Sequence, residues 1–111
     1  MSDLINNIAN FFKILGDPKR LEILLYLKDG EKTSADIQVK INKPQPTVSQ
    51  HLKVLNNENL ITFVKKENVK YYSIKDPFLF KILSSIQSFL INLNKEKVKA
   101  LTDMSIFDTL I

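Results

Sequence analysis

KPQPTVSQHLKVL, residues 43–55, opens with two prolines among polar residues and ends as a leucine-spaced helix. Val48, Leu52 and Leu55 follow one another at helical spacing, which predicts a single apolar stripe facing a core. The step from Lys43 to Pro44 predicts an extended entry, because the residue before a proline avoids the helical region. The outward side of this helix is polar and carries Gln45, Thr47, Ser49, Gln50 and Lys53. Such a side is either an ordinary solvated surface or a surface that contacts a partner with hydrogen-bonding edges.

Three helices are predicted before this stretch. The first covers about residues 2–15 and has a regular apolar stripe. Asp17 caps a second helix and Pro18 takes its first position, which is the favoured place for proline. The residues predicted to bury its inner side are Leu21, Leu24, Leu25 and Leu27. The second helix ends at about residue 29, and a short third helix begins near residue 33.

A hairpin and a long helix are predicted after it. In ITFVKKENVKYYSI, residues 61–74, two β-rich runs flank a charged turn at Glu67 and Asn68. Asp76 and Pro77 repeat the cap-plus-proline pattern and begin a helix that ends near residue 93. Its apolar stripe consists of Leu79, Ile82, Leu83, Ile86, Leu90 and Leu93. The predicted fold class is therefore mainly α with a small β-hairpin, in one domain over residues 1–111.

The positive charge of the chain is concentrated in one segment. Between Lys40 and Lys75 there are seven basic residues and two acidic ones, a formal charge of +5, whereas the rest has nine basic against ten acidic residues, a charge of −1. A localised basic stretch is the footprint expected for a polyanionic partner. A basic face that only keeps the protein in solution is the alternative.

The composition excludes several functions. There is no cysteine, one histidine and two glycines, so neither a catalytic constellation nor a tetrahedral metal site can be assembled, and we expect no enzyme, cofactor or metal. No apolar run is long enough to span a bilayer, so no membrane partner is expected. The absence of cysteine and the polar start MSDLINN, which lacks the features of a secretory signal, favour the cytoplasm.

The first and last predicted helices carry apolar stripes that the small central core does not fully cover. Uncovered stripes of this size usually mark a partner surface, and most oligomers are two-fold homodimers. We therefore expect these two helices to form a homodimer. The alternative is that both helices pack within one chain.

Several stretches in the same order resemble the ArsR/SmtB family of winged-helix repressors. They are FKILGDPKRLEILLYL, PQPTVSQHLKVL followed by NLI, and VKYYSI, and the resemblance covers about residues 8–93. It implies a winged helix-turn-helix homodimer paired through its first and last helices, at about residues 2–15 and 76–93. The helix-turn-helix would cover about residues 33–58 and the wing about residues 60–75.

The resemblance also implies roles for the outward side chains. In a helix-turn-helix the second helix lies in the major groove of DNA, and its polar side chains meet base edges. The residues expected there are Gln45, Thr47, Ser49 and Gln50. Lysines at the helix and the wing would contact phosphate, and they are Lys43, Lys53, Lys65, Lys66 and Lys70. His51 is expected to pack against the core or contact phosphate, and Arg20 to form a structural ion pair or a phosphate contact.

The sequence departs from the metal-sensing members that it resembles. Thr33 and Ala35 occupy the positions of their cysteine pair, while Phe78, Phe89 and Asn92 occupy those of their last-helix histidines. The resemblance therefore implies that metal and thiol sensing are absent. The aromatic residues around the last helix leave a small-molecule effector site open, although aromatic residues at helical spacing are more often core.

Two departures bear on how DNA would be read. Pro44 stands where relatives place a serine cap, and Glu67-Asn68 replaces a glycine at the wing tip. The main hypothesis is a sequence-specific regulator of double-stranded DNA, of the repressor type, which binds a pseudo-palindromic operator. The alternative is a winged-helix module that binds another protein. The operator, the inducer and the role of residues 94–111 do not follow from the sequence.

Overall fold

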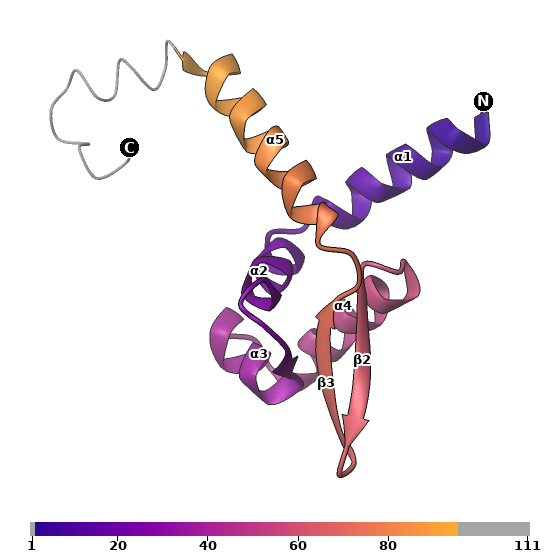
Figure 1. Ribbon diagram of the computed structural model, residues 1–111, viewed down its shortest axis with the longest axis vertical. Helices are drawn as coiled ribbons and strands as arrows, with labels where there is room; N and C mark the ends of the chain where they lie inside the picture. The colour runs from indigo at the N-terminus through magenta and orange to yellow at the C-terminus, as the bar shows by residue number, and fades with distance from the viewer. Residues whose placement is uncertain (1, 96–111) are drawn as a thin grey trace, which may run out of the picture. The chain divides into compact units, whose positions relative to one another are not determined.

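The computed structural model describes residues 2–95, of which residues 2–77 form one compact unit and a second unit begins at Phe78. Within residues 2–77 the helices are α1 (Ser2–Leu15), α2 (Pro18–Leu27), α3 (Ser34–Ile41) and α4 (Gln45–Asn57). The strands are β1 (Lys32–Thr33), β2 (Ile61–Lys66) and β3 (Val69–Ile74), and α5 (Phe78–Leu93) belongs to the second unit (Figure 1). The predicted fold class, mainly α with a β-hairpin, is confirmed.

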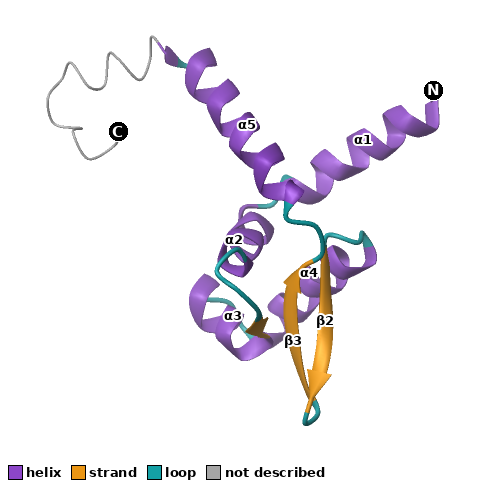
Figure 2. Cartoon of the chain, in the orientation of Figure 1, coloured by secondary structure: helices purple, strands orange, loops and turns teal. Residues whose placement is uncertain are grey.

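The core of the first unit lies where α2, α3 and α4 meet the root of the hairpin (Figure 2). It consists of Ile23, Leu24, Leu27, Ile37, Ile41, Val48, Leu52, Leu55 and Ile61. No polar or charged residue is buried within residues 2–95, so apolar burial supplies most of the stability of this unit. Each fully buried leucine or isoleucine side chain contributes about 1.5–3 kcal/mol relative to an exposed one.

The sheet has the strand order β1-β3-β2, and both neighbouring pairs are antiparallel. Glu67 and Asn68 form the two-residue turn between β2 and β3 with φ values of 51° and 64°, the positive values that a type I′ hairpin turn requires. The predicted hairpin is therefore confirmed. The short strand β1 is absent from the prediction, because two residues are too few to show a strand periodicity.

The helices begin and end at the residues that their sequences indicate. Asp17 caps α2 by accepting hydrogen bonds from the backbone N–H groups of Lys19 and Arg20. Thr33 and Asp36 form a capping box at α3, and Asn42 ends that helix in the left-handed conformation. These contacts fix both ends of the short helix that precedes α4.

The predicted inner side of α2 is partly wrong. Leu24 and Leu27 are buried and Leu21 is half-buried, but Leu25 is 53% exposed and Ile23 is buried instead. Successive helix positions differ by about 100°, so Leu25 lies far round the helix from Ile23 and Leu27. The prediction chose residues by type, whereas the angle around the helix decides which of them the core covers.

Two helices keep most of their apolar side chains in contact with solvent. In α1 only Ile14 and Leu15 are buried, while Leu4, Ile8 and Phe12 are exposed. In α5 only Leu79 is buried, and Phe89 and Leu93 are 64% and 68% exposed. The predicted stripes are therefore present, and a single chain leaves much of each uncovered.

Candidate nucleic-acid interface

Helix α4 is anchored by one side and presents the other. Val48, Leu52 and Leu55 are buried, as predicted, and hold the helix against α2, α3 and β2. The side chains on its outward side that are exposed are Gln45, Ser49, Gln50 and Lys53. Thr47 and His51 are half-buried, at the border between the two sides. The polar residues that the sequence placed on one side of this helix thus share an accessible surface.

The turn before α4 fixes how that surface is presented. The backbone N–H of Lys43 donates to the carbonyl of Gln38 at 3.2 Å, and the Lys19 ammonium donates to the carbonyl of Ile41 at 3.1 Å. Both contacts satisfy carbonyls at the end of α3. The side chain of Lys43 is exposed beside the start of α4, where a lysine was predicted to meet phosphate.

The start of α4 differs from the starts of α2 and α3. Pro44 occupies the cap position and the helix begins at Gln45, as predicted, but no side chain hydrogen-bonds to its first N–H groups. Pro44 and Pro46 have no N–H group, so only Gln45 and Thr47 supply N–H donors at this start, and the helix dipole adds partial positive charge there. The beginning of α4 is therefore electrostatically suited to an anionic surface.

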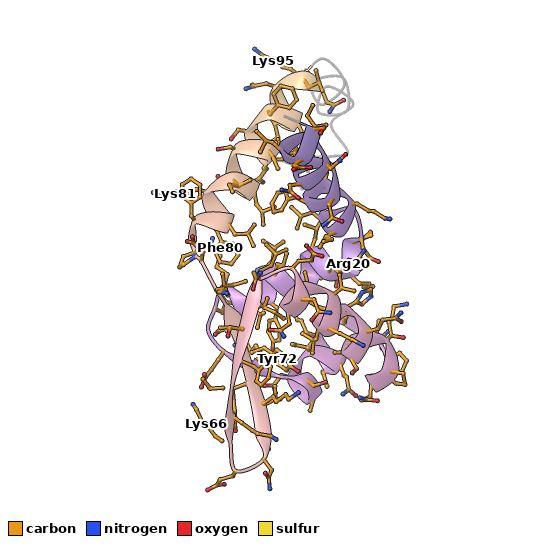
Figure 3. The ribbon with its side chains drawn as sticks, turned by 90° about the vertical axis from the view of Figure 1, so that its right-hand side faces the viewer. Arg20, Lys66, Tyr72, Phe80, Lys81 and Lys95 are labelled. Atoms are coloured by element: carbon orange, nitrogen blue, oxygen red, sulfur yellow. The ribbon has the colours of Figure 1, made fainter. Side chains whose placement is uncertain are left out.

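The two faces of the hairpin carry different lysines. Lys65 pairs with Lys70 and Phe63 pairs with Tyr72 across the strands, and alternation along each strand puts these four residues on one face. We call this side of the hairpin the inner face. Its residues Lys65, Lys70 and Tyr72 line an open groove of about 570 Å³, together with Gln45, Ser49 and Leu52 of α4. In Figure 3 Tyr72 lies on the side of the hairpin toward the helices.

The inner face is partly apolar beneath its charges. The rings of Phe63 and Tyr72 contact each other with centroids 5.6 Å apart, and the Lys70 ammonium lies 4.6 Å from the Phe63 centroid. Burial raises the pKa of the Tyr72 phenol. The groove thus joins cations, a donor hydroxyl and the polar side of α4.

The outer face carries Lys66, and this lysine has a partner that the sequence did not reveal. Its ammonium lies 2.7 Å from a carboxylate oxygen of Glu31 and 4.9 Å from the centroid of the Tyr71 ring. The hydrogen bond from Lys66 to Glu31 and the charge of that carboxylate raise the pKa of Lys66. Glu31 is 35 positions away from Lys66, beside the strand β1 that went unpredicted, so no local pattern indicated the pair.

Arg20 and Asp17 have structural contacts at the start of α2. Arg20 donates through Nε to the carbonyl of Ile14 at 2.8 Å, which ties the end of α1 to α2. Burial raises the pKa of Asp17, but the N–H groups of Lys19 and Arg20 and the charges of His51 and Arg20 lower it more. Asp17 therefore stays ionised as the cap of α2.

The described part of the chain lacks the features of a metal site and of a membrane-spanning helix. Residues 2–95 contain no group of three or more histidine, aspartate or glutamate side chains placed to hold a metal ion. The same residues include no helix that is long and apolar enough to cross a membrane.

Comparison with known proteins agrees with this geometry. Residues 17–62 match the family model of the bacterial regulatory protein, arsR family. The chain is 33% identical to the transcriptional repressor SdpR of Bacillus subtilis over 73% of this chain and 90% of that protein. It is 38% identical to the arsenical resistance operon repressor of Staphylococcus xylosus over 65% of this chain and 69% of that protein.

The fold has close counterparts among solved structures. The homodimeric winged helix-turn-helix DNA-binding domain of a possible ArsR-family regulator from Mycobacterium bovis superimposes with a TM-score of 0.72 at 24% identity. The superposition covers 80% of this chain and 82% of that domain. This likeness confirms that α3 and α4 with the β2–β3 hairpin form a winged helix-turn-helix.

Proposed function

This chain belongs to the arsR family of bacterial regulatory proteins and is a DNA-binding transcriptional repressor, and on that premise we propose which of its surfaces contact the duplex. We place α4 in the major groove with its polar side toward the base edges, and the tip of the wing in the adjacent minor groove between its two phosphate strands. The observation that carries this proposal is the groove in which the exposed side of α4 meets the inner-face lysines.

The base-reading set is proposed to lie in the first two turns of α4. Gln45 and Gln50 can each form a bidentate pair with adenine, and Thr47 and Ser49 can donate to or accept from several bases. Gln45, Ser49 and Gln50 are exposed, which supports direct contact. Thr47 is half-buried, so its hydroxyl can contact only a base edge that lies close to the helix.

The phosphate-binding set is proposed to flank that helix on two sides. Lys43 and Lys53 are exposed on or beside α4, and Lys65 and Lys70 are exposed on the wing. His51 would add a donor at the border of the helix surface, and Lys66 would join after leaving Glu31. Lysine side chains reach phosphate as flexible point charges, so these residues supply affinity that does not depend on sequence.

Regulators of this family act as homodimers, and we propose that α1 and α5 form the dimer of this one. The support is the exposed apolar surface of both helices, with Phe12 56% and Phe89 64% exposed in the single chain. The Mycobacterium bovis domain of the same fold is also homodimeric. A two-fold dimer would place two copies of α4 in major grooves about 34 Å apart, which requires a pseudo-palindromic operator.

The experiment begins with a preferred duplex selected by the protein from a random pool. Gln45→Ala should weaken binding to this duplex by about 1–3 kcal/mol while leaving affinity for random duplex nearly unchanged. The matched control is Lys53→Ala on the same helix, which should weaken both complexes alike. Fluorescence anisotropy at fixed salt gives the affinities of the wild type and both variants for the two duplexes.

Equal loss on both duplexes from Gln45→Ala would contradict the assigned reading side. Affinity that stays constant from about 50 to 200 mM salt would contradict the phosphate contacts, because binding through several phosphates weakens steeply with salt. If no duplex binds and a partner protein co-purifies instead, the protein-interaction alternative replaces the proposal.

A further inference from the structure

The pair between Lys66 and Glu31 divides the cations of the wing into two groups. Lys65 and Lys70 lie on the inner face beside α4, whereas Lys66 lies on the opposite face and reaches across Tyr71 to Glu31. In Figure 3 Lys66 is seen on the side of the hairpin away from the helices. One cation of the wing is therefore neutralised by the chain itself.

The backbone on both sides of Glu31 is fixed, which keeps its carboxylate within reach of Lys66. It follows Gly30, whose φ of 128° lies in the region that favours glycine, and it precedes β1. In β1, Lys32 pairs with Tyr72 and Thr33 pairs with Tyr71, so the backbone next to Glu31 is fixed to the wing. The capping box of Thr33 fixes the other side of this short strand. The carboxylate thus stands at a set position beside the outer face.

We propose that Glu31 competes with DNA phosphate for Lys66 and so limits the affinity of the wing for any duplex. This inference rests on the proposed DNA-binding surface. A wing tip that enters the minor groove, which is about 6 Å wide, has a phosphate strand on each side. Inner-face Lys65 and Lys70 would meet one strand, and the outer-face Lys66 is the lysine placed to meet the other. A carboxylate and a phosphate diester oxygen offer the same ammonium the same kind of charge-assisted hydrogen bond.

The expected size of the effect follows from the exposure of the pair. The side chains of Lys66 and Glu31 are 56% and 42% exposed, so their attraction is screened by water and salt. Exposed pairs of this kind change an equilibrium by about 1.5- to 5-fold. A dimer has two wings, which makes the expected change in DNA affinity about 2- to 25-fold. The change should be equal on selected and random duplexes, since phosphates carry no sequence.

The test is a double-mutant cycle of Glu31→Gln and Lys66→Ala, measured by anisotropy on selected and random duplexes. Glu31→Gln should raise both affinities, and the gain should vanish in the Lys66→Ala background and shrink at high salt. Asp29→Asn is the matched control, because it removes one exposed negative charge two residues from Glu31. It should give a clearly smaller gain that does not depend on Lys66. Thermal unfolding checks that all variants fold.

The outcomes separate this inference from the function on which it rests. A gain that survives in the Lys66→Ala background, or that equals the Asp29→Asn gain, would mean a general charge effect and would overturn the competition. No gain at all would overturn it as well, while wild-type binding to the selected duplex would leave the proposed function intact. Failure of the wild type to bind any duplex would overturn both.

Discussion

Helices α4 and α5 are both amphipathic, yet the chain treats their apolar sides in opposite ways. In α4 the three apolar residues of the stripe, Val48, Leu52 and Leu55, are all buried. In α5 a longer stripe has only Leu79 buried, and Phe89 and Leu93 are more than half exposed. An apolar stripe that its own chain covers leaves the polar side to act, whereas an uncovered stripe requires a partner. This difference supports the proposal that α4 contacts DNA and that α5 associates with a second copy of the chain.

The largest expected effect comes from placing a charge on the exposed apolar surface of α5, beside the predicted stripe. Phe89→Asp should convert the dimer to a monomer and lower affinity for the selected duplex by about 10²–10⁴-fold, because the two reading helices then bind separately. Sedimentation velocity and anisotropy measure the two results. Gln87→Asp, at an exposed polar position of α5, is the control and should change neither. A dimeric Phe89→Asp variant with normal affinity would remove α5 from the interface.

The next largest effect is expected from truncating one leucine side chain in α4 and one in α5. Leu55→Ala should lower the free energy of unfolding by about 2–5 kcal/mol, because the side chain is fully buried and leaves a cavity. Leu93→Ala should instead weaken the proposed dimer and leave the folded monomer nearly as stable, so its unfolding midpoint should depend less on protein concentration than that of the wild type. Urea unfolding at two protein concentrations distinguishes the two responses. Identical responses from both variants would erase the contrast between the helices.

The smallest effect concerns the helix caps that support α4. Asp17→Ala should cost about 1 kcal/mol of unfolding free energy at neutral pH and leave the dimer intact. The folded-state pKa of Asp17 is below its ordinary value of 3.8, so its contribution is present above that value and is lost as pH falls through the folded pKa. The difference in unfolding free energy between Asp17→Ala and the wild type, measured by urea unfolding, should therefore become smaller below about pH 4. A difference that is constant with pH would contradict the cap.

Much of the fold could be predicted because its signals are local. The stripe of α4, the cap at Asp17, and the turn at Glu67 and Asn68 each depend on residues a few positions apart, and all three are confirmed. The error at Leu25 and the missing strand β1 arose where burial and pairing depend on distant segments. Local patterns fix elements, while tertiary contacts decide which side of an element is covered.

The same division holds for the candidate site. The polar side of α4 was readable from its spacing, because the opposite side had to be apolar. The sequence did not show that Lys65 and Lys70 face α4 while Lys66 contacts Glu31. This arrangement depends on the register of the strands and on a contact between residues 35 positions apart. The roles of the named side chains toward DNA stay predictions that the variants above test.

Methylation interference on the selected duplex tests most directly the central claim that α4 is presented twice to the major groove. Methylation of guanine N7 reports the major groove, and methylation of adenine N3 reports the minor groove. We expect two clusters of guanine N7 interference, related by two-fold symmetry and about one helical turn apart. A single cluster, or interference confined to adenine N3, would contradict it.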